Sequence, residues 1–389
     1  MRKWISLLLL VPAFCVFAEE EATDSEVAMT DGGFGKGAIK NTLTARMERI
    51  EGRVADIEQK NVNDKYAGKS LITRCCEDED SFAIYGDFLW WRAQNDGFKY
   101  ALDLYAERST NVVSMPYDWD PGFRLGLGYN TSYDGWDIYA LWTYFHNKST
   151  HSLSNYDYSD ESDMFPIYFP SVAIGFTFIP AGVDVGIPSI GYCKASWDID
   201  YDTVELLFDR DFFIGKSLAL KPFFAAKALF LKQKFLMHYA DPDPTDLDYL
   251  VFFPLDVRLQ SKYWGVGPKV GLDTSWYLLK QLKLYANVAA DLVYGERKEY
   301  INATSPEENL QLEGRNKMDV LTPTLNMAVG AAFTYCFDES TSLDLHVAWE
   351  TLYIWNQYIS QAFTQIYTYH NLNEPLHMQG LTAGAEIRF

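Results

Sequence analysis

Many segments of this chain alternate apolar with polar residues, and their polar faces carry charged side chains. Ten acids and six bases share the polar faces of these segments, which would form ion pairs or line a water-filled passage leaning weakly toward cations. The alternative is that the charges merely pair and fill the interior. The candidates for lining such a passage are Asp87, Arg124, Asp137, Asp198, Asp200, Asp202, Lys221, Lys227, Lys269, Asp273, Lys283, Asp291, Asp344, His346, Glu350, Glu386 and Arg388.

Catalytic and metal-binding patterns are weaker. His346 lies two residues from Asp344 and four from Glu350, which permits an acid–base cluster, although a buried structural histidine is the simpler interpretation. The segment Asp241–Asp248 holds four carboxylates but lacks the glycine and glutamate of an EF-hand loop. Neither a Gly-x-Ser-x-Gly nor a Cys-x-x-Cys motif occurs. We therefore expect no enzyme, no metal site and no cofactor.

The last stretch of the sequence indicates the kind of element that positions these charges. Apolar and polar residues alternate there, as a strand of a membrane barrel requires, with lipid on one face and water or polar side chains on the other. The terminal aromatic resembles the closing strand of bacterial outer-membrane barrels. We expect the apolar face to act as a barrel-assembly signal, made of Leu381, Ala383, Ala385, Ile387 and Phe389.

Similar strand patterns fill the rest of the chain from Ser81 onward. Short connections follow every second strand and long ones follow the others, which is typical of an up-and-down barrel inserted from one side of a membrane. We expect an all-β transmembrane barrel of about ten antiparallel strands, or 12 or more if 97–105 or 165–179 add to the wall. The strands lie at about 82–93, 119–131, 134–147, 193–208, 216–235, 257–277, 281–297, 318–337, 341–357 and 376–389.

Two irregular stretches need separate interpretations. The strand 257–277 changes phase between Leu259 and Trp264, which suggests a bulge beside Gly265. The connection 148–192 carries an uncharged, proline-broken run from Phe165 to Pro180. We expect this run to fold into the barrel mouth or against a neighbouring subunit and to set the pore size, the alternative being an extra hairpin of the wall.

The residues before the barrel fall into four segments. Residues 1–18 are typical of a secretory signal peptide, 19–40 of a flexible linker, 41–62 of a coiled-coil-like periplasmic helix and 63–80 of a linker with a cysteine pair, leaving 81–389 for the barrel. The formal net charge of −20 argues against nucleic acid, and also against anionic lipid, as an electrostatic partner.

The helix 41–62 repeats its apolar seam at heptad spacing. Isoleucine at the d positions favours a trimer or tetramer over a dimer. We expect a homo-oligomer, most simply a trimer, although a single amphipathic helix on the barrel mouth fits the same pattern. The seam residues are Leu43, Met47, Ile50, Val54, Ile57 and Asn61.

Three cysteines lie near one rim of the expected barrel. Cys75 and Cys76 precede the first strand, and Cys336 ends the eighth strand at the same rim. One of the adjacent pair is expected to reach Cys336 and the other a neighbouring envelope molecule, because adjacent cysteines rarely bond to each other without strain. The alternative is that all four cysteines, including Cys193 at the outer rim, are free.

Three motifs resemble the Legionella-type major outer membrane protein family, which has relatives in Chlamydia-related bacteria. They are Tyr85-Gly-Asp-Phe-Leu-Trp-Trp-Arg92, Trp119-Asp-Pro-Gly-Phe-Arg-Leu-Gly-Leu-Gly-Tyr129 and Gly135-Trp-Asp-Ile-Tyr-Ala-Leu-Trp-Thr143. The resemblance would extend from Ser81 to Phe389. It implies a pore-forming outer-membrane barrel, cysteine cross-linked in some members, and supplies no catalytic residue.

The sequence thus predicts a porin of the bacterial outer membrane, in contact with its lipid, that passes small hydrophilic solutes. A ten-stranded barrel would leave a narrow pore at best, since eight strands leave room only for side chains and open channels have about 16–18. The alternative is a structural or adhesive surface protein with a closed barrel.

Overall fold

The computed structural model describes residues 80–95, 97–105, 109–131, 136–154, 162–167, 190–214, 217–240, 254–305, 310–337, 341–357 and 375–389. All of them belong to one compact unit, Lys69–Phe389. The expected signal peptide, both linkers, the helix 41–62 and the pair Cys75 and Cys76 lie outside the described residues, so these expectations stay predictions. Within the described residues, no helix has the length and apolar character needed to cross a membrane.

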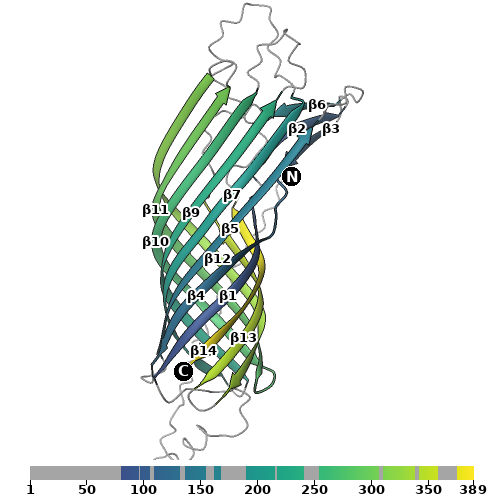
Figure 1. Cartoon of the computed structure of the whole chain (residues 1–389). Coiled ribbons are helices and arrows are strands. Elements are labelled where there is room, and N and C mark those ends of the chain that lie inside the picture. Colours follow the sequence, from purple (N-terminus) through teal and green to yellow (C-terminus); the bar gives the residue numbers. More distant parts are fainter. Residues whose placement is uncertain are drawn as a thin grey trace, which may run out of the picture. The chain divides into compact units, whose positions relative to one another are not determined.

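Ten antiparallel strands form a closed barrel, which confirms the predicted fold class (Figure 1). Each strand pairs with the next wall strand along the chain, and β14 pairs with β1 to complete the cylinder. The wall strands are β1 (Ser81–Gln94), β4 (Asp120–Asn130), β5 (Trp136–Ser154), β7 (Tyr192–Arg210), β9 (Leu218–Ala240), β10 (Leu255–Tyr277), β11 (Leu282–Ser305), β12 (Leu310–Cys336), β13 (Ser342–Ile354) and β14 (Leu376–Arg388).

Four further strands lie outside this wall sequence. β2 (Lys99–Tyr105) pairs with β3 (Ser109–Ser114) and with β6 (Ser162–Pro166) in a separate three-stranded sheet. β8 (Phe212–Ile214) is a short addition beside the start of β9. The segment 97–105 therefore forms a strand but adds none to the wall, so the barrel keeps ten strands. Figure 1 shows β2, β3 and β6 at the end of the barrel opposite the C-terminus. We refer to that end as the loop end and to the other as the turn end.

The outer wall carries an apolar band near the turn end. On β10 the band runs from Trp264 to Trp276, and Val266 and Val270 between them are each 58% exposed. Twelve residues of strand rise by about 40 Å. A tilt of roughly 35–45° reduces this to about 30 Å, the thickness of the hydrocarbon core of a bilayer. Tryptophans at both edges match the aromatic girdles of such barrels.

Beyond the band, toward the loop end, the two faces of β10 exchange their polarity. The outward residues of β10 become polar, while the inward ones become apolar and buried. The reason is the change of surroundings: above the bilayer the outer wall meets water, and the interior at this level is packed with buried side chains. The outward residues are Lys262, Gln260, Arg258 and Asp256, and the inward ones are Leu259, Val257 and Leu255.

This exchange corrects two predictions. The phase change in β10 is not a bulge, since β10 pairs with β9 in unbroken register from Leu255 to Trp276. Asp198, Asp200 and Asp202 do not line the interior. They lie on the outer face of β7 above the apolar band, where Asp202 accepts a 2.8 Å hydrogen bond from the outward-facing Trp142. Polar residues were assigned to the interior along the whole strand, although this rule holds only within the membrane.

Candidate functional site

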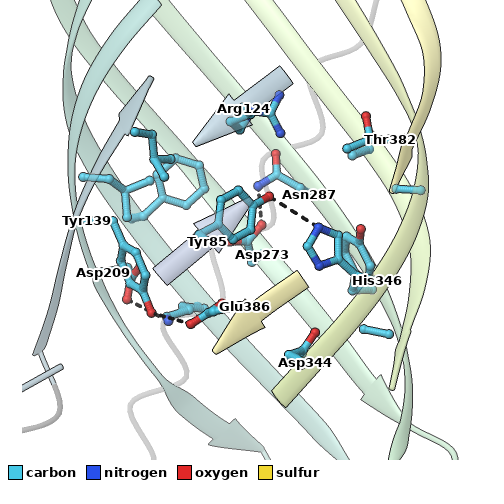
Figure 2. Close-up of a pocket in the computed structure, with 18 of the residues that line it drawn as sticks. Tyr85, Arg124, Tyr139, Asp209, Asp273, Asn287, Asp344, His346, Thr382 and Glu386 are labelled. Atoms are coloured by element: carbon cyan, nitrogen blue, oxygen red, sulfur yellow. Dashed lines mark hydrogen bonds and ion pairs between the residues drawn. The ribbon is translucent and has the colours of Figure 1, made fainter. Parts of the chain in front are cut away.

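The interior of the turn-end half holds a cavity of about 380 Å³ (Figure 2). Polar and charged side chains from most of the wall strands surround it, together with Tyr85, Tyr139, Tyr201 and Tyr285. Eleven of the predicted pore-lining residues contribute to its wall. They are Arg124, Lys221, Lys227, Lys269, Asp273, Lys283, Asp344, His346, Glu350, Glu386 and Arg388.

Three more predicted residues face inward but are buried against the wall. Asp87 pairs with Arg124 at 3.2 Å, Asp137 with Lys221 at 3.1 Å and Asp291 with Lys227 at 2.8 Å. Their carboxylates hold the cavity-lining bases in place instead of meeting water themselves.

A network centred on Arg124 crosses the cavity wall. Its guanidinium donates to Asp87 and, at 2.9 Å, to Glu350. Glu350 also accepts hydrogen bonds from Thr382 and Asn326 at 3.0 and 2.9 Å. Arg124, Asp87 and Glu350 each have a partner of opposite charge, and these ion pairs join β1, β4 and β13. The hydrogen bonds from Asn326 and Thr382 add β12 and β14 to the network.

His346 belongs to the same network, but not in the way that its sequence neighbours suggested. Its Nε2 lies 2.8 Å from Oδ1 of Asp87. The contact spans β14, because Gly384 of that strand pairs with Asp87 of β1 on one side and with His346 of β13 on the other. Among its described contacts the ring has no ion pair with Asp344 or Glu350. The ring is therefore held by Asp87 of β1, two strands away in the wall.

A second cluster of charges lies deeper in the cavity. Lys269 bonds to Glu205 at 2.7 Å, and Lys227 lies 3.9 Å from the same carboxylate. Glu205 and Asp209 were both missed in the sequence because the polar run Asp198–Asp202 set the wrong phase for β7. The neighbouring apolar residues Val204 and Leu206, which face lipid, carried the correct signal.

The third cluster lies at the turn end. Lys221 bridges Asp137 and Asp209, the latter at 2.9 Å. Lys283 bonds to Asp344 at 2.7 Å, and Arg388 bonds to Glu386 at 2.6 Å. All six predicted interior bases therefore have acidic partners, as the ion-pair alternative requires. Asp273 differs, since its described hydrogen bond comes from the Asn287 amide and from no base.

An apolar core replaces the cavity in the loop-end half. Inward side chains from eight wall strands are no more than 3% exposed there, so the described residues close the barrel at this level. They are Ala93, Asn147, Trp197, Phe235, Leu259, Ile301, Ile354 and Met378.

Two long connections contribute to this closure. We define the plug as residues 98–105, 109–115, 162–167 and 190, which comprise the sheet β2–β3–β6 and its flanks. Phe98 packs on Trp197 and Phe235 with ring centroids 5.0 and 4.7 Å apart. Tyr239 of the wall donates a 2.7 Å hydrogen bond to the carbonyl of Tyr100. Burial raises the pKa of the Tyr100 phenol, which bonds to His151.

The plug bears on the prediction for the connection 148–192. Met164, Ile167 and Ile190 from this connection are buried in the apolar core, so the start of the run and the last residues of the connection before β7 fold into the barrel mouth. Most of the run Phe165–Pro180 lies outside the described residues, and its effect on pore size stays a prediction.

For the other predicted residues the structure gives a position where it describes them, while their roles stay predictions. The assembly-signal residues Leu381, Ile387 and Phe389 are exposed on the outer face of β14, while their role in assembly stays a prediction. Cys336 ends β12 and is not a free thiol. Cys193 is buried in the apolar core, where its thiol donates to the sulfur of Met164 at 3.5 Å. The seam Leu43–Asn61 lies outside the described residues.

Comparison with known proteins gives one family. The family described as Legionella pneumophila major outer membrane protein precursor matches residues 73–389 of this chain. No curated protein matches. The match begins eight residues before the predicted start of the resemblance at Ser81 and includes Cys75 and Cys76.

Solved structures of outer-membrane barrels are similar at low identity. The outer membrane protease OmpT from Escherichia coli is 10% identical, with 82% of this chain and 99% of that chain covered and a TM-score of 0.38. The Pseudomonas putida toluene transporter TodX is 9% identical over 82% and 92% of the two chains, with a TM-score of 0.30. A major outer membrane protein from Thermus thermophilus is 12% identical over 80% and 99%, with a TM-score of 0.29.

Proposed function

The chain belongs to the Legionella major outer membrane protein family and is a protein of the outer membrane, and from this premise we propose that it is a passive channel for small hydrophilic solutes. In this proposal the channel is closed at its loop end by the plug. The turn-end cavity is the part of the pathway that is already open, and the protein has no catalytic activity.

The charged cavity is the observation that carries this proposal. A barrel that serves only as an anchor gains nothing from about 380 Å³ of space lined with ionised groups. A diffusion channel needs such a lining, because polar walls keep water and solutes in the passage. Asp273, the acid without a basic partner among its described contacts, supports a weak preference for cations.

The origin of the closure also supports a channel. Part of the apolar core comes from connections between wall strands, namely Phe98, Tyr100, Met115 and Met164. Connections are more mobile than the elements that they join. The plug can therefore leave the mouth while the ten-stranded wall keeps its hydrogen bonds.

A structural or adhesive surface protein with a closed barrel is the second candidate. The complete pairing of the six interior bases favours it, because fixed ion pairs fill an interior without requiring flow through it. The fully buried Trp197 and Phe235 favour it as well, since they belong to the wall and would stay after the plug has moved.

Planar-bilayer conductance separates the two candidates. We expect the wild-type protein to stay mostly closed and a plug-less variant to conduct steadily. In this variant residues 97–117 and 162–167 are each replaced by a short Gly-Ser linker. The matched control is Val112→Ser, which changes an exposed side chain of β3 outside the apolar core and should leave the barrel closed. A folded plug-less barrel that does not conduct would support the closed surface protein.

Two partner proposals accompany this function. We propose that the seam of residues 41–62 joins three copies of the chain, and that Cys336 takes part in a disulfide with Cys75 or Cys76. The heptad spacing supports the first proposal. The position of Cys336 at the turn end of β12, where the first strand also begins, supports the second.

A further inference from the structure

Four lysines form a row across the outer wall at the loop end. They are direct cross-strand neighbours: Lys232 of β9 pairs with Lys262 of β10, Lys262 with Lys298 of β11, and Lys298 with Lys317 of β12. Their side chains point outward, because the residues before and after Lys232, Lys262 and Lys298 are buried. Adjacent strands are about 4.8 Å apart, so the row is about 14 Å long. We name it the lysine row.

The lysine row begins where the apolar band ends. The next outward residues toward the membrane are Phe230 below Lys232 and Trp264 below Lys262, both about half exposed. On β11 and β12 one acidic position, Glu296 or Asp319, lies between the row and the exposed residues Tyr294 and Leu321. The row thus lies at the level of lipid headgroups, above a wall that would contact lipid tails.

The charges of this row are only partly balanced. Lys298 and Lys317 share the single carboxylate of Glu296, at 2.7 and 2.5 Å, and remain 62% and 64% exposed. Lys232 bonds to Asp200 at 3.2 Å, and His146 bonds to the same carboxylate. No ion pair involves Lys262 within the described part of the chain. Like charges directly opposite each other in a sheet are destabilising, so a row of four indicates a need for an external anion.

We propose that the lysine row binds the phosphorylated headgroup of a lipid in the outer leaflet. The ammonium groups present multiple donors at the level of the phosphates, and the apolar wall below accommodates the acyl chains of the same molecule. By the topology rule of short periplasmic turns and long outer loops, the row lies on the outer side of the membrane. A lipid with two phosphates matches a row of this length better than a single free phosphate.

The proposal concerns a local surface and not the charge of the whole protein. The net charge of −20 argued against anionic lipid as a partner, because composition averages over all faces. The fold brings together four lysines that are 30, 36 and 19 residues apart in the sequence. Cross-strand register, which composition does not reveal, produces the basic row.

Lipid binding by the refolded full-length protein tests the proposal. The probes are bisphosphorylated lipid A in mixed micelles with a zwitterionic detergent, the same lipid without its phosphates, and inorganic phosphate alone. Each lysine near an anionic surface contributes roughly five-fold in affinity, so Lys262→Gln with Lys317→Gln should weaken lipid A binding by about 25-fold. The matched control is Lys148→Gln with Lys194→Gln, which removes two exposed outward lysines of β5 and β7 away from the row and should change binding by less than about two-fold.

The outcomes are distinct. Weaker binding of the row variant, with loss of binding for the dephosphorylated lipid, supports the proposal. Equal affinity of wild type and row variant overturns it, as does equal binding of the two lipids by the wild type. Inorganic phosphate that displaces lipid A at equal concentration shows a simple anion site and overturns the lipid assignment. Heat-dependent gel mobility confirms that each variant is folded, and the two-lipid comparison on the wild type needs no variant.

Discussion

Replacing Gly384 by alanine should break the network that joins β1, β13 and β14. Gly384 lies between Asp87 and His346 in the register of the sheet. A Cβ atom there would lie 1.9 Å from Oδ1 of Asp87 and 2.6 Å from the carbonyl oxygen of Gly86. Only a residue without a side chain leaves room for the Asp87–His346 contact.

The size of the effect follows from what Asp87 holds. Its carboxylate side chain is fully buried and bonds to Arg124, His346 and the Tyr85 hydroxyl, the last at 2.5 Å. Overpacking a closely packed site costs about 1–3 kcal/mol. Breaking one partner out of a buried ion pair costs about 3–5 kcal/mol. In the Gly384→Ala variant the Asp87 side chain relieves part of the overlap by moving away from Arg124, which breaks this ion pair. We therefore expect the free energy of unfolding to fall by about 3–5 kcal/mol.

Urea unfolding of the refolded barrel in lipid vesicles measures this change. The matched control is Gly86→Ala on the neighbouring strand, where a Cβ atom would meet nothing closer than a side-chain carbon of Leu125 at 3.7 Å. That variant should stay within about 1 kcal/mol of the wild type. Combining Gly384→Ala with Asp87→Ala removes one of the colliding groups, so the two effects should sum to less than their separate values.

Two results would refute the reasoning. A loss below about 1 kcal/mol for Gly384→Ala would mean that the strands adapt without disturbing Asp87. If the losses of stability from Gly384→Ala and Asp87→Ala were strictly additive, the two residues would not interact, and the loss from Gly384→Ala would have another origin.

Three further predictions follow from the fold and the site. In the plug-less variant, Asp273→Asn should lower the preference for cations in reversal-potential measurements, whereas Asp200→Asn should leave it unchanged, because only Asp273 lines the cavity. Equal shifts of the reversal potential would contradict the assignment of Asp273 to the inner face and Asp200 to the outer face. Cys336→Ser should abolish reductant-sensitive bands on non-reducing gels while Cys193→Ser keeps them, because the Cys193 side chain is buried in the apolar core and does not reach a neighbouring molecule. A ladder that survives Cys336→Ser removes the proposed disulfide. Deleting residues 41–62 should convert cross-linked trimers to monomers with the barrel intact, and trimers that persist would place the interface elsewhere.

Much of the barrel was predictable because its strands meet two different solvents. The alternation in 376–389 and the long and short connections identified an even number of strands, and the structure has ten. The same alternation placed Arg124, Lys269 and Glu350 correctly around the cavity. Within the membrane, the free energy of exposing a charge to hydrocarbon is large enough to decide which face points inward.

The prediction failed where the wall leaves the membrane. Asp198, Asp200 and Asp202 were assigned to the interior, and Glu205 was missed as a result. The sequence does not state where the bilayer ends, and the pattern inverts at that level. The apparent bulge beside Gly265 had the same cause, because an inverted pattern and an extra residue look alike in one strand.

The sequence by itself determined that the chain is a membrane barrel, since period-2 patterning and the lengths of connections are local properties. Only the tertiary structure decided that the loop-end half is closed by β2, β3 and β6, that His346 bonds to Asp87, and that four distant lysines form one row. Each of these depends on which residues face each other across strands. Register is set by the closure of the whole cylinder, and no single strand contains that information.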